Sequence, residues 1–202
     1  MKYYIINNEL FDNTEFAYSE RFGKINSGEA IRCNECGSFL SMLKWLPPYQ
    51  LKVSKKNLGD FIFGTQNGFV LSEKAKTLFE QSGQKGLNNF KKVELYYKMV
   101  KLESNYYYPE ITLSDVRINI KKSGLRFDSQ KECDCCQKAG RIIKDMKGVF
   151  FENENQINED VFFTKMLSGT ITVSENFISF VNKYKLTNLK FIEVEKYIPV
   201  WL

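Results

Sequence analysis

Residues 70–95 read VLSEKAKTLFEQSGQKGLNNFKKVEL, and residues 172–194 read TVSENFISFVNKYKLTNLKFIEV. Both stretches carry a Ser-Glu pair near their start, at Ser72 and at Ser174, and they align to their ends after a three-residue gap. Serine is a preferred helix cap because its side chain accepts a hydrogen bond from a free N–H of the first turn. The Glu that follows suits the positive end of the helix dipole. Each stretch therefore predicts a capped helix followed by a strand.

The segments around these two stretches predict more strands. They are short and rich in β-branched and aromatic residues, at 2–7, 49–54, 60–64, 68–72, 110–120, 148–152 and 169–173. Gly83 is expected to end the first helix, and Asn67-Gly68 to form a hairpin turn. The polar segment FENENQINED (151–160) predicts a solvated loop. The fold class predicted is α+β, with strands outnumbering a few helices.

Two cysteine pairs precede the two capped helices at similar distances. One lies in IRCNECGSF (31–39) and the other in KECDCCQKA (131–139). A cysteine pair, a Ser-Glu helix start and a following strand thus occur twice in the same order, which is the signature of an internal repeat. The sequence predicts a single domain, 1–202, built of two repeat-like halves, about 1–100 and 101–202.

The two pairs together offer four thiols, those of Cys33, Cys36, Cys133 and Cys136. Zinc prefers four tetrahedral ligands, and a site made only of thiolates is a common structural solution. The chain has no histidine, so cysteine is the soft ligand it can offer. These four residues are predicted to hold one structural zinc that joins the halves.

The residues beside the ligands differ between the two pairs. Gly37 suits the tight turn in which backbone N–H groups approach the sulfurs. Gln137 stands in that place in the second pair and predicts a less regular turn there. Cys135 is a fifth thiol, either a spare or a competitor of Cys136 for the metal. A redox pair and cysteines that no longer bind metal remain the alternatives to zinc.

Composition and charge bear on location and partners. The formal net charge is +5, and the basic residues are dispersed without a run of five or six. Nucleic-acid binding is therefore permitted by charge but not indicated by it. The first residues, MKYYIINNELFDNTEF, lack the features of a signal peptide, and no apolar run reaches 18 residues. We expect a cytoplasmic protein, in which paired cysteines mean metal or redox chemistry more often than disulfides.

The sequence offers no catalytic constellation. Without histidine the commonest general base is missing, together with the Ser-His and Cys-His nucleophile arrangements. The phosphate-binding, metalloprotease and nucleophile-elbow motifs are missing too. We therefore expect a protein that is not an enzyme.

Three stretches resemble the bacterial double-CxxCG motif proteins: CNECG (33–37), the segment from 45 to 95, and the second half from CDCC (133–136) to 194. The resemblance covers nearly the whole chain and departs from the family pattern at Gln137. It implies an immunity protein that binds and neutralises a cognate bacterial toxin. The tyrosines of SNYYYPE (104–110) and the acidic segment 151–160 are candidate contact surfaces. A zinc-ribbon protein with a nucleic-acid-binding or regulatory role is the rival interpretation.

Overall fold

The structure is a computed structural model, and it describes residues 1–6, 15–20, 22, 26–65, 68–129, 132–138, 142–199 and 202. The strands are β1 (Tyr3–Ile6), β2 (Ser19–Glu20), β3 (Gln50–Val53), β4 (Phe61–Thr65), β5 (Gly68–Ser72), β6 (Leu87–Tyr97), β7 (Val100–Lys101), β8 (Tyr106–Ser114), β9 (Arg126–Phe127), β10 (Ile143–Asp145), β11 (Val161–Thr164), β12 (Ile171–Ser174) and β13 (Phe191–Glu193). The helices are α1 (Glu73–Ser82), α2 (Ile120–Ser123) and α3 (Glu175–Lys183), with 3-10 turns η1 (Glu154–Gln156) and η2 (Val194–Lys196). The predicted α+β class is confirmed.

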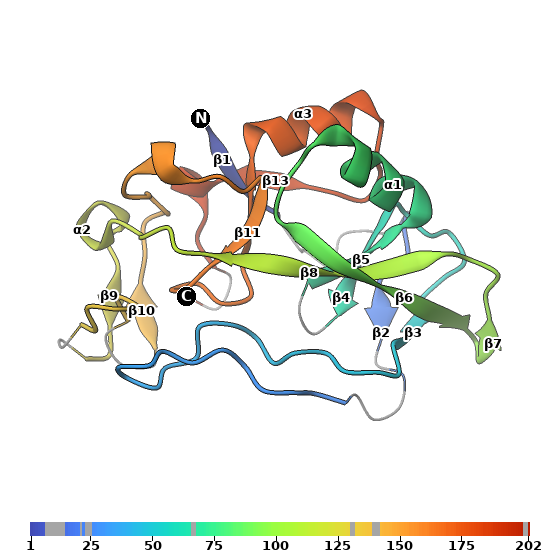
Figure 1. The fold of residues 1–202 in the computed structure, drawn as a ribbon, viewed down its shortest axis with the longest axis horizontal. Coiled ribbons are helices and arrows are strands. Elements are labelled where there is room, and N and C mark those ends of the chain that lie inside the picture. Colours follow the sequence, from blue (N-terminus) through green and yellow to red (C-terminus); the bar gives the residue numbers. More distant parts are fainter. Residues whose placement is uncertain are drawn as a thin grey trace.

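One large sheet organises the described residues. Its strands follow the order β13-β1-β12-β11-β8-β6-β3-β2, with β4, β5 and β7 joined beside this path. The long strand β8 is central because it pairs with β5 and β6 antiparallel and with β11 parallel. Strands β9 and β10 form a separate two-stranded sheet. Figure 1 shows β8 crossing the middle of the molecule, with β9 and β10 at one end.

Each of the two longer helices follows a β-hairpin. The hairpin β4–β5 leads into α1, and the hairpin β11–β12 leads into α3. Ser72 and Ser174 are the N-caps, and their side chains accept hydrogen bonds from the backbone N–H groups of Ala75 and Phe177. The helix starts predicted from the Ser-Glu pairs are confirmed. Gly83 ends α1 in the left-handed conformation (φ 73°), also as predicted.

The two helices lie side by side above the sheet (Figure 1). Their apolar faces meet where Phe79 of α1 contacts Phe177 and Phe180 of α3, with ring centroids 6.5 and 6.1 Å apart. Residues of β4, β5, β11 and β12 complete this core. A second cluster surrounds Tyr3 and Phe162, and a third surrounds Trp45 and Leu95. Burial of these apolar side chains is the main force that stabilises the arrangement.

Two local predictions were wrong. Residues 148–152 form no strand; Phe151 makes only an isolated bridge to Ile118, and the strand that precedes β12 is β11 instead. The strand expected over 110–120 ends at Ser114, whose side chain accepts a hydrogen bond from the N–H of Val116 and so turns the chain.

Two further sequence predictions concern the hairpin and membrane segments. The strands β4 and β5 pair antiparallel as expected, but Asn67 of the predicted turn lies outside the described residues. Across the described ranges, no helix has the length and apolar character needed to span a membrane.

Candidate metal centre

The two cysteine pairs form turns with the same backbone hydrogen bonds. The N–H of Gly37 donates to the carbonyl of Cys33 (2.9 Å), and the N–H of Gln137 donates to the carbonyl of Cys133 (2.7 Å). Gly37 and Gln137 both adopt left-handed backbone angles, with φ of 69° and 61°. The less regular second turn predicted from Gln137 is therefore wrong.

Gln137 tolerates this conformation because its side chain is bound on both sides. Its Oε1 accepts from the backbone N–H of Ile118 (3.1 Å), and its Nε2 donates to the carbonyl of the same residue (3.2 Å). The side chain is buried, so neither hydrogen bond competes with bulk water. These two bonds offset the cost of the left-handed angle and fix the second turn to the body of the protein.

The first turn lies at the tip of an extended two-armed segment, residues 26–46, which we call the cysteine ribbon. Its arms are joined by bridges from Ser27 to Trp45 and from Arg32 to Phe39. Backbone hydrogen bonds between Gly28 and Lys44 and between Leu40 and Ile31 add to them. Figure 1 shows the ribbon running along the side of the molecule opposite α1 and α3. It carries Cys33 and Cys36 to the second turn.

The four predicted ligand residues come together. The sulfurs of Cys33 and Cys133 are 3.7 Å apart, those of Cys36 and Cys136 are 3.5 Å apart, and all four lie within 4.8 Å of one another. A tetrahedral zinc with Zn–S bonds of about 2.3 Å needs sulfurs about 3.8 Å apart. The arrangement is compatible with a metal site formed by both turns.

The local electrostatics also suit a cation. Hydrogen bonds from the backbone N–H groups of Cys36 and Glu35 lower the pKa of Cys33 to about 6, so that its thiolate is the main form at neutral pH. Burial raises the pKa of Cys136 to about 12. A buried thiol of this kind ionises readily only when a positive charge such as a metal ion lies beside it. The donor set therefore fits a thiophilic ion such as zinc.

A lysine borders the four-cysteine cluster. Lys138 donates a hydrogen bond from its Nζ to the carbonyl of Phe39, which joins the second turn to the ribbon. Burial lowers the pKa of Lys138, and the neighbouring sulfurs of Cys136 and Cys36 oppose that shift when they are ionised. A positive side chain here would partly balance the excess negative charge of four thiolates around one divalent ion.

Cys135 lies outside the group of four but beside it, because its interaction with the sulfur of Cys33 raises the pKa of Cys135. It is exposed and does not belong to the group of sulfurs within 4.8 Å. Its backbone N–H donates to the carboxylate of Glu35 (3.2 Å), which also lies 3.4 Å from the sulfur of Cys133. Glu35 thus contributes a second link from the ribbon to the opposite turn.

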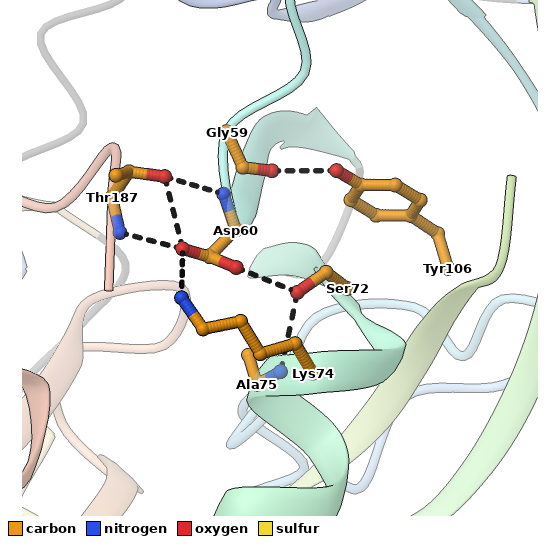
Figure 2. A network of polar contacts seen from close by, with 7 residues as sticks. All are labelled: Gly59, Asp60, Ser72, Lys74, Ala75, Tyr106 and Thr187. Carbon is orange, nitrogen blue, oxygen red and sulfur yellow. Dashed lines mark hydrogen bonds and ion pairs between the residues drawn. The ribbon is translucent and has the colours of Figure 1, made fainter. Parts of the chain in front are cut away.

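A polar network around Asp60 was missed at the level of the sequence (Figure 2). The carboxylate accepts from the hydroxyl of Ser72 (2.8 Å) and from the N–H and hydroxyl of Thr187 (3.0 and 3.1 Å). Lys74 lies 3.6 Å away, and the hydroxyl of Tyr106 donates to the carbonyl of Gly59 next to Asp60. One aspartate therefore joins the N-cap of α1 to the loop that follows α3.

Asp160 makes equivalent contacts at the start of the second hairpin, β11–β12. It accepts from the hydroxyl of Ser174 (2.6 Å) and from the N–H of Lys85 (3.0 Å), so it joins the N-cap of α3 to the loop that follows α1. Gly86 is required here, since a Cβ would lie 1.8 Å from the carbonyl oxygen of Val161. The sequence does contain a signal, because each aspartate opens a similar apolar run, DFIF or DVFF.

The two candidate contact segments have different environments. Tyr106 and Tyr108 of the first segment are buried in β8, where they belong to the core. Half of the residues of the acidic segment 151–160 are exposed, and the segment includes η1, but Asp160 at its end is part of the cap network described above. Tyr106 and Tyr108 therefore contribute mainly to the hydrophobic core.

Comparison with known proteins identifies the family. Residues 45–196 match the immunity protein family Imm11, which is well over half of the chain. The chain belongs to this family. The match includes Cys133 and Cys136 and begins after Cys33 and Cys36, so the double-CxxCG description still depends on the cysteine pairs themselves. No curated protein matches the chain at a significant level.

Proposed function

We propose that the chain is a non-enzymatic, zinc-binding immunity protein of the cytoplasm that binds and neutralises a cognate bacterial toxin. The observation that carries this proposal is the Imm11 match over residues 45–196. Immunity proteins protect by binding, so the sequence does not need the histidine or the nucleophile motifs that it lacks. The resemblance of both halves to double-CxxCG proteins leads to the same function independently.

The metal in this proposal is one structural zinc held by Cys33, Cys36, Cys133 and Cys136. When bound, it supplies a closed tetrahedral link and no open coordination position for a substrate. The chain's own residues complete the link, because Glu35 and Lys138 connect the ribbon to the second turn by hydrogen bonds. The site would hold the ribbon against the second half of the molecule.

We further propose that the single domain consists of two related halves, about 1–100 and 101–202. Reciprocal contacts support this reading, because Asp60 reaches the loop after α3 while Asp160 reaches the loop after α1. Strand pairing is reciprocal too. Ser72 lies opposite Tyr106 of β8, and Ser174 lies opposite Tyr3 of β1, so each hairpin is extended by the first strand of the other half.

Co-expression with the product of the adjacent toxin gene tests the function. Cells that make the toxin alone should die, and cells that also make this chain should grow. The purified pair should form a complex with a nanomolar Kd, about −12 kcal/mol. If the product of the adjacent gene is harmless, or kills equally in the presence of this chain, the proposal is contradicted. The zinc-ribbon nucleic-acid-binding protein then becomes the preferred hypothesis.

Elemental analysis tests the metal separately. Protein purified without added metal should carry about one zinc per chain at a site of four thiolates. A well-folded protein free of zinc would contradict the metal assignment and leave the immunity function in place. A disulfide between Cys33 and Cys36 would favour redox chemistry instead.

A further inference from the structure

The cysteine ribbon (residues 26–46) exposes an unusual number of large apolar side chains. Elsewhere the described residues expose such side chains mainly singly, at chain ends and hairpin tips. In the ribbon, five of them fall within 16 residues, and they are Ile31 (54% exposed), Phe39 (47%), Met42 (43%), Leu43 (45%) and Leu46 (37%). Soluble proteins seldom leave large apolar side chains gathered at the surface unless they contact a partner.

Both ends of the ribbon are fixed, so these side chains are presented on a preformed element. At its base Trp45 is buried, with its ring against those of Tyr49 and Tyr108 at 5.2 and 5.1 Å. At its tip Cys33 and Leu40 are buried beside Cys136. A partner that bound the ribbon would not have to order it first, which reduces the entropic cost of association.

The charges of the ribbon indicate what kind of partner fits. The chain carries +5 overall, yet the ribbon holds two acidic and two basic residues and is neutral. Its cations are already engaged, because Arg32 stacks on the ring of Phe39 at 3.9 Å and Lys44 forms an ion pair with Glu110 at 3.5 Å. Nucleic acid and anionic lipid both require excess positive charge. An apolar protein surface is the matching chemistry.

The exposure of the ribbon indicates how a protein partner would contact it. Met42 and Leu43 are neighbours in the chain and both are exposed, so the ribbon is accessible from more than one side. An element that is accessible from two sides is contacted more completely by a groove than by a flat surface. The family match begins at residue 45, so residues 26–44 of the ribbon lie outside the matched part, and Trp45 and Leu46 lie inside it. Apart from Leu46, the exposed apolar side chains stand outside both the Imm11 match and the CNECG motif (33–37), at positions suited to recognising one particular toxin.

We propose that the cysteine ribbon is the docking element for the cognate toxin, inserting its exposed apolar side chains into an apolar groove of that protein. This inference rests on the immunity function proposed above. The four-cysteine site has a defined role in it, since it holds the tip of the ribbon in the conformation that the toxin meets.

The test compares two double variants of the full-length chain by titration calorimetry against the adjacent gene's toxin, inactivated by mutation. The ribbon variant is Ile31→Glu with Leu43→Glu. The control is Met99→Glu with Val100→Glu, because those residues are even more exposed (72% and 66%) and lie at the β6–β7 turn. We expect the ribbon variant to raise Kd at least 100-fold and the control to change it less than about 3-fold. Thermal unfolding of both variants establishes that each is folded.

Three outcomes for folded protein would overturn the inference. If the native chain binds the toxin and the folded ribbon variant binds equally well, the docking surface lies elsewhere while the immunity function stands. If the native chain does not bind the toxin at all, the function itself fails. If sedimentation shows a native dimer that the ribbon variant dissociates, the ribbon is a contact between two copies of the chain. A ribbon variant that does not fold is replaced by Ile31→Ser with Leu43→Ser, and the same criteria apply.

Discussion

The two cysteine turns have one backbone geometry and two different surroundings. Gly37 lies at an exposed tip, where an added Cβ would meet nothing within 4 Å. Gln137 lies in the body of the protein, with its side chain bound to both backbone groups of Ile118. Glycine provides the left-handed angle without strain, whereas glutamine needs hydrogen bonds that offset it. The turn is thus set by its backbone bonds, and the environment decides which residue can occupy it.

The aspartates at the helix caps also occupy equivalent positions with different surroundings. Asp60 and Asp160 each bind the capping serine of their own helix and a backbone N–H beyond the other helix. Asp60 has an additional hydroxyl donor in Thr187 and an ion pair with Lys74. The two aspartates therefore link α1 and α3 through equivalent positions, and Asp60 has the larger number of partners.

The largest effect is expected from removing a metal ligand. Cys33→Ser and Cys136→Ser should each abolish zinc binding, because one missing thiolate opens the tetrahedron. Each should lower the free energy of unfolding by about 4 kcal/mol or more, the range typical of a lost metal site. Zinc content and denaturant unfolding measure the two effects.

Cys135→Ser is the matched control for these ligand variants. Its side chain is exposed and outside the four-sulfur group, so zinc content and stability should stay unchanged. If Cys135→Ser loses zinc while Cys136→Ser keeps it, the ligand assignment in the second turn is wrong.

The aspartates should give the next largest effect. Asp60→Ala should cost about 3 kcal/mol and Asp160→Ala about 2 kcal/mol, because hydrogen bonds to a charged group contribute about 1.5–3 kcal/mol and Asp60 makes more of them. Chemical denaturation of the two variants measures the difference. Asp160→Ala as the more damaging change would reverse the ranking of the two contacts.

The turns themselves supply a smaller test. Gln137→Ala keeps the left-handed angle and loses both bonds to Ile118, so it should cost about 2 kcal/mol. Gly37→Ala adds only the strain of a Cβ at positive φ and should cost about 1 kcal/mol. Gln137→Gly should fall between the native chain and Gln137→Ala, since it removes the strain together with the bonds. Equal stability of Gln137→Ala and the native chain would mean that the bonds to Ile118 are unimportant.

Local signals in the sequence predicted one part of this structure and missed another. The capped helices and the grouping of the four cysteines were predictable, because Ser-Glu and Cys-x-x-Cys are short patterns whose chemistry depends on adjacent residues. The strand β11 was missed, since Phe150 and Phe151 gave an equally good strand pattern at an earlier position in the sequence. The role of Asp60 was also missed, because its partner Thr187 is 127 residues away and no local pattern reports such a contact.

The smallest effect concerns acid stability and compares Glu94 with Glu193, which align in the two repeat-like stretches. Hydrogen bonds from Lys101, Gln50 and Tyr96 lower the pKa of Glu94 to about 2, while Lys196, with a smaller contribution from the charge of Lys2, lowers the pKa of Glu193. A carboxylate whose pKa is lower in the folded state stabilises the fold above its unfolded pKa of about 4.5, and that contribution is lost as the pH falls toward 2. Glu94→Gln should therefore flatten the decline of stability between pH 4.5 and 2, and Glu193→Gln should flatten it less. Both carboxylates are partly exposed, so the difference should shrink in high salt. Urea unfolding as a function of pH measures it, and identical curves for the two variants would show that the additional partners of Glu94 contribute nothing.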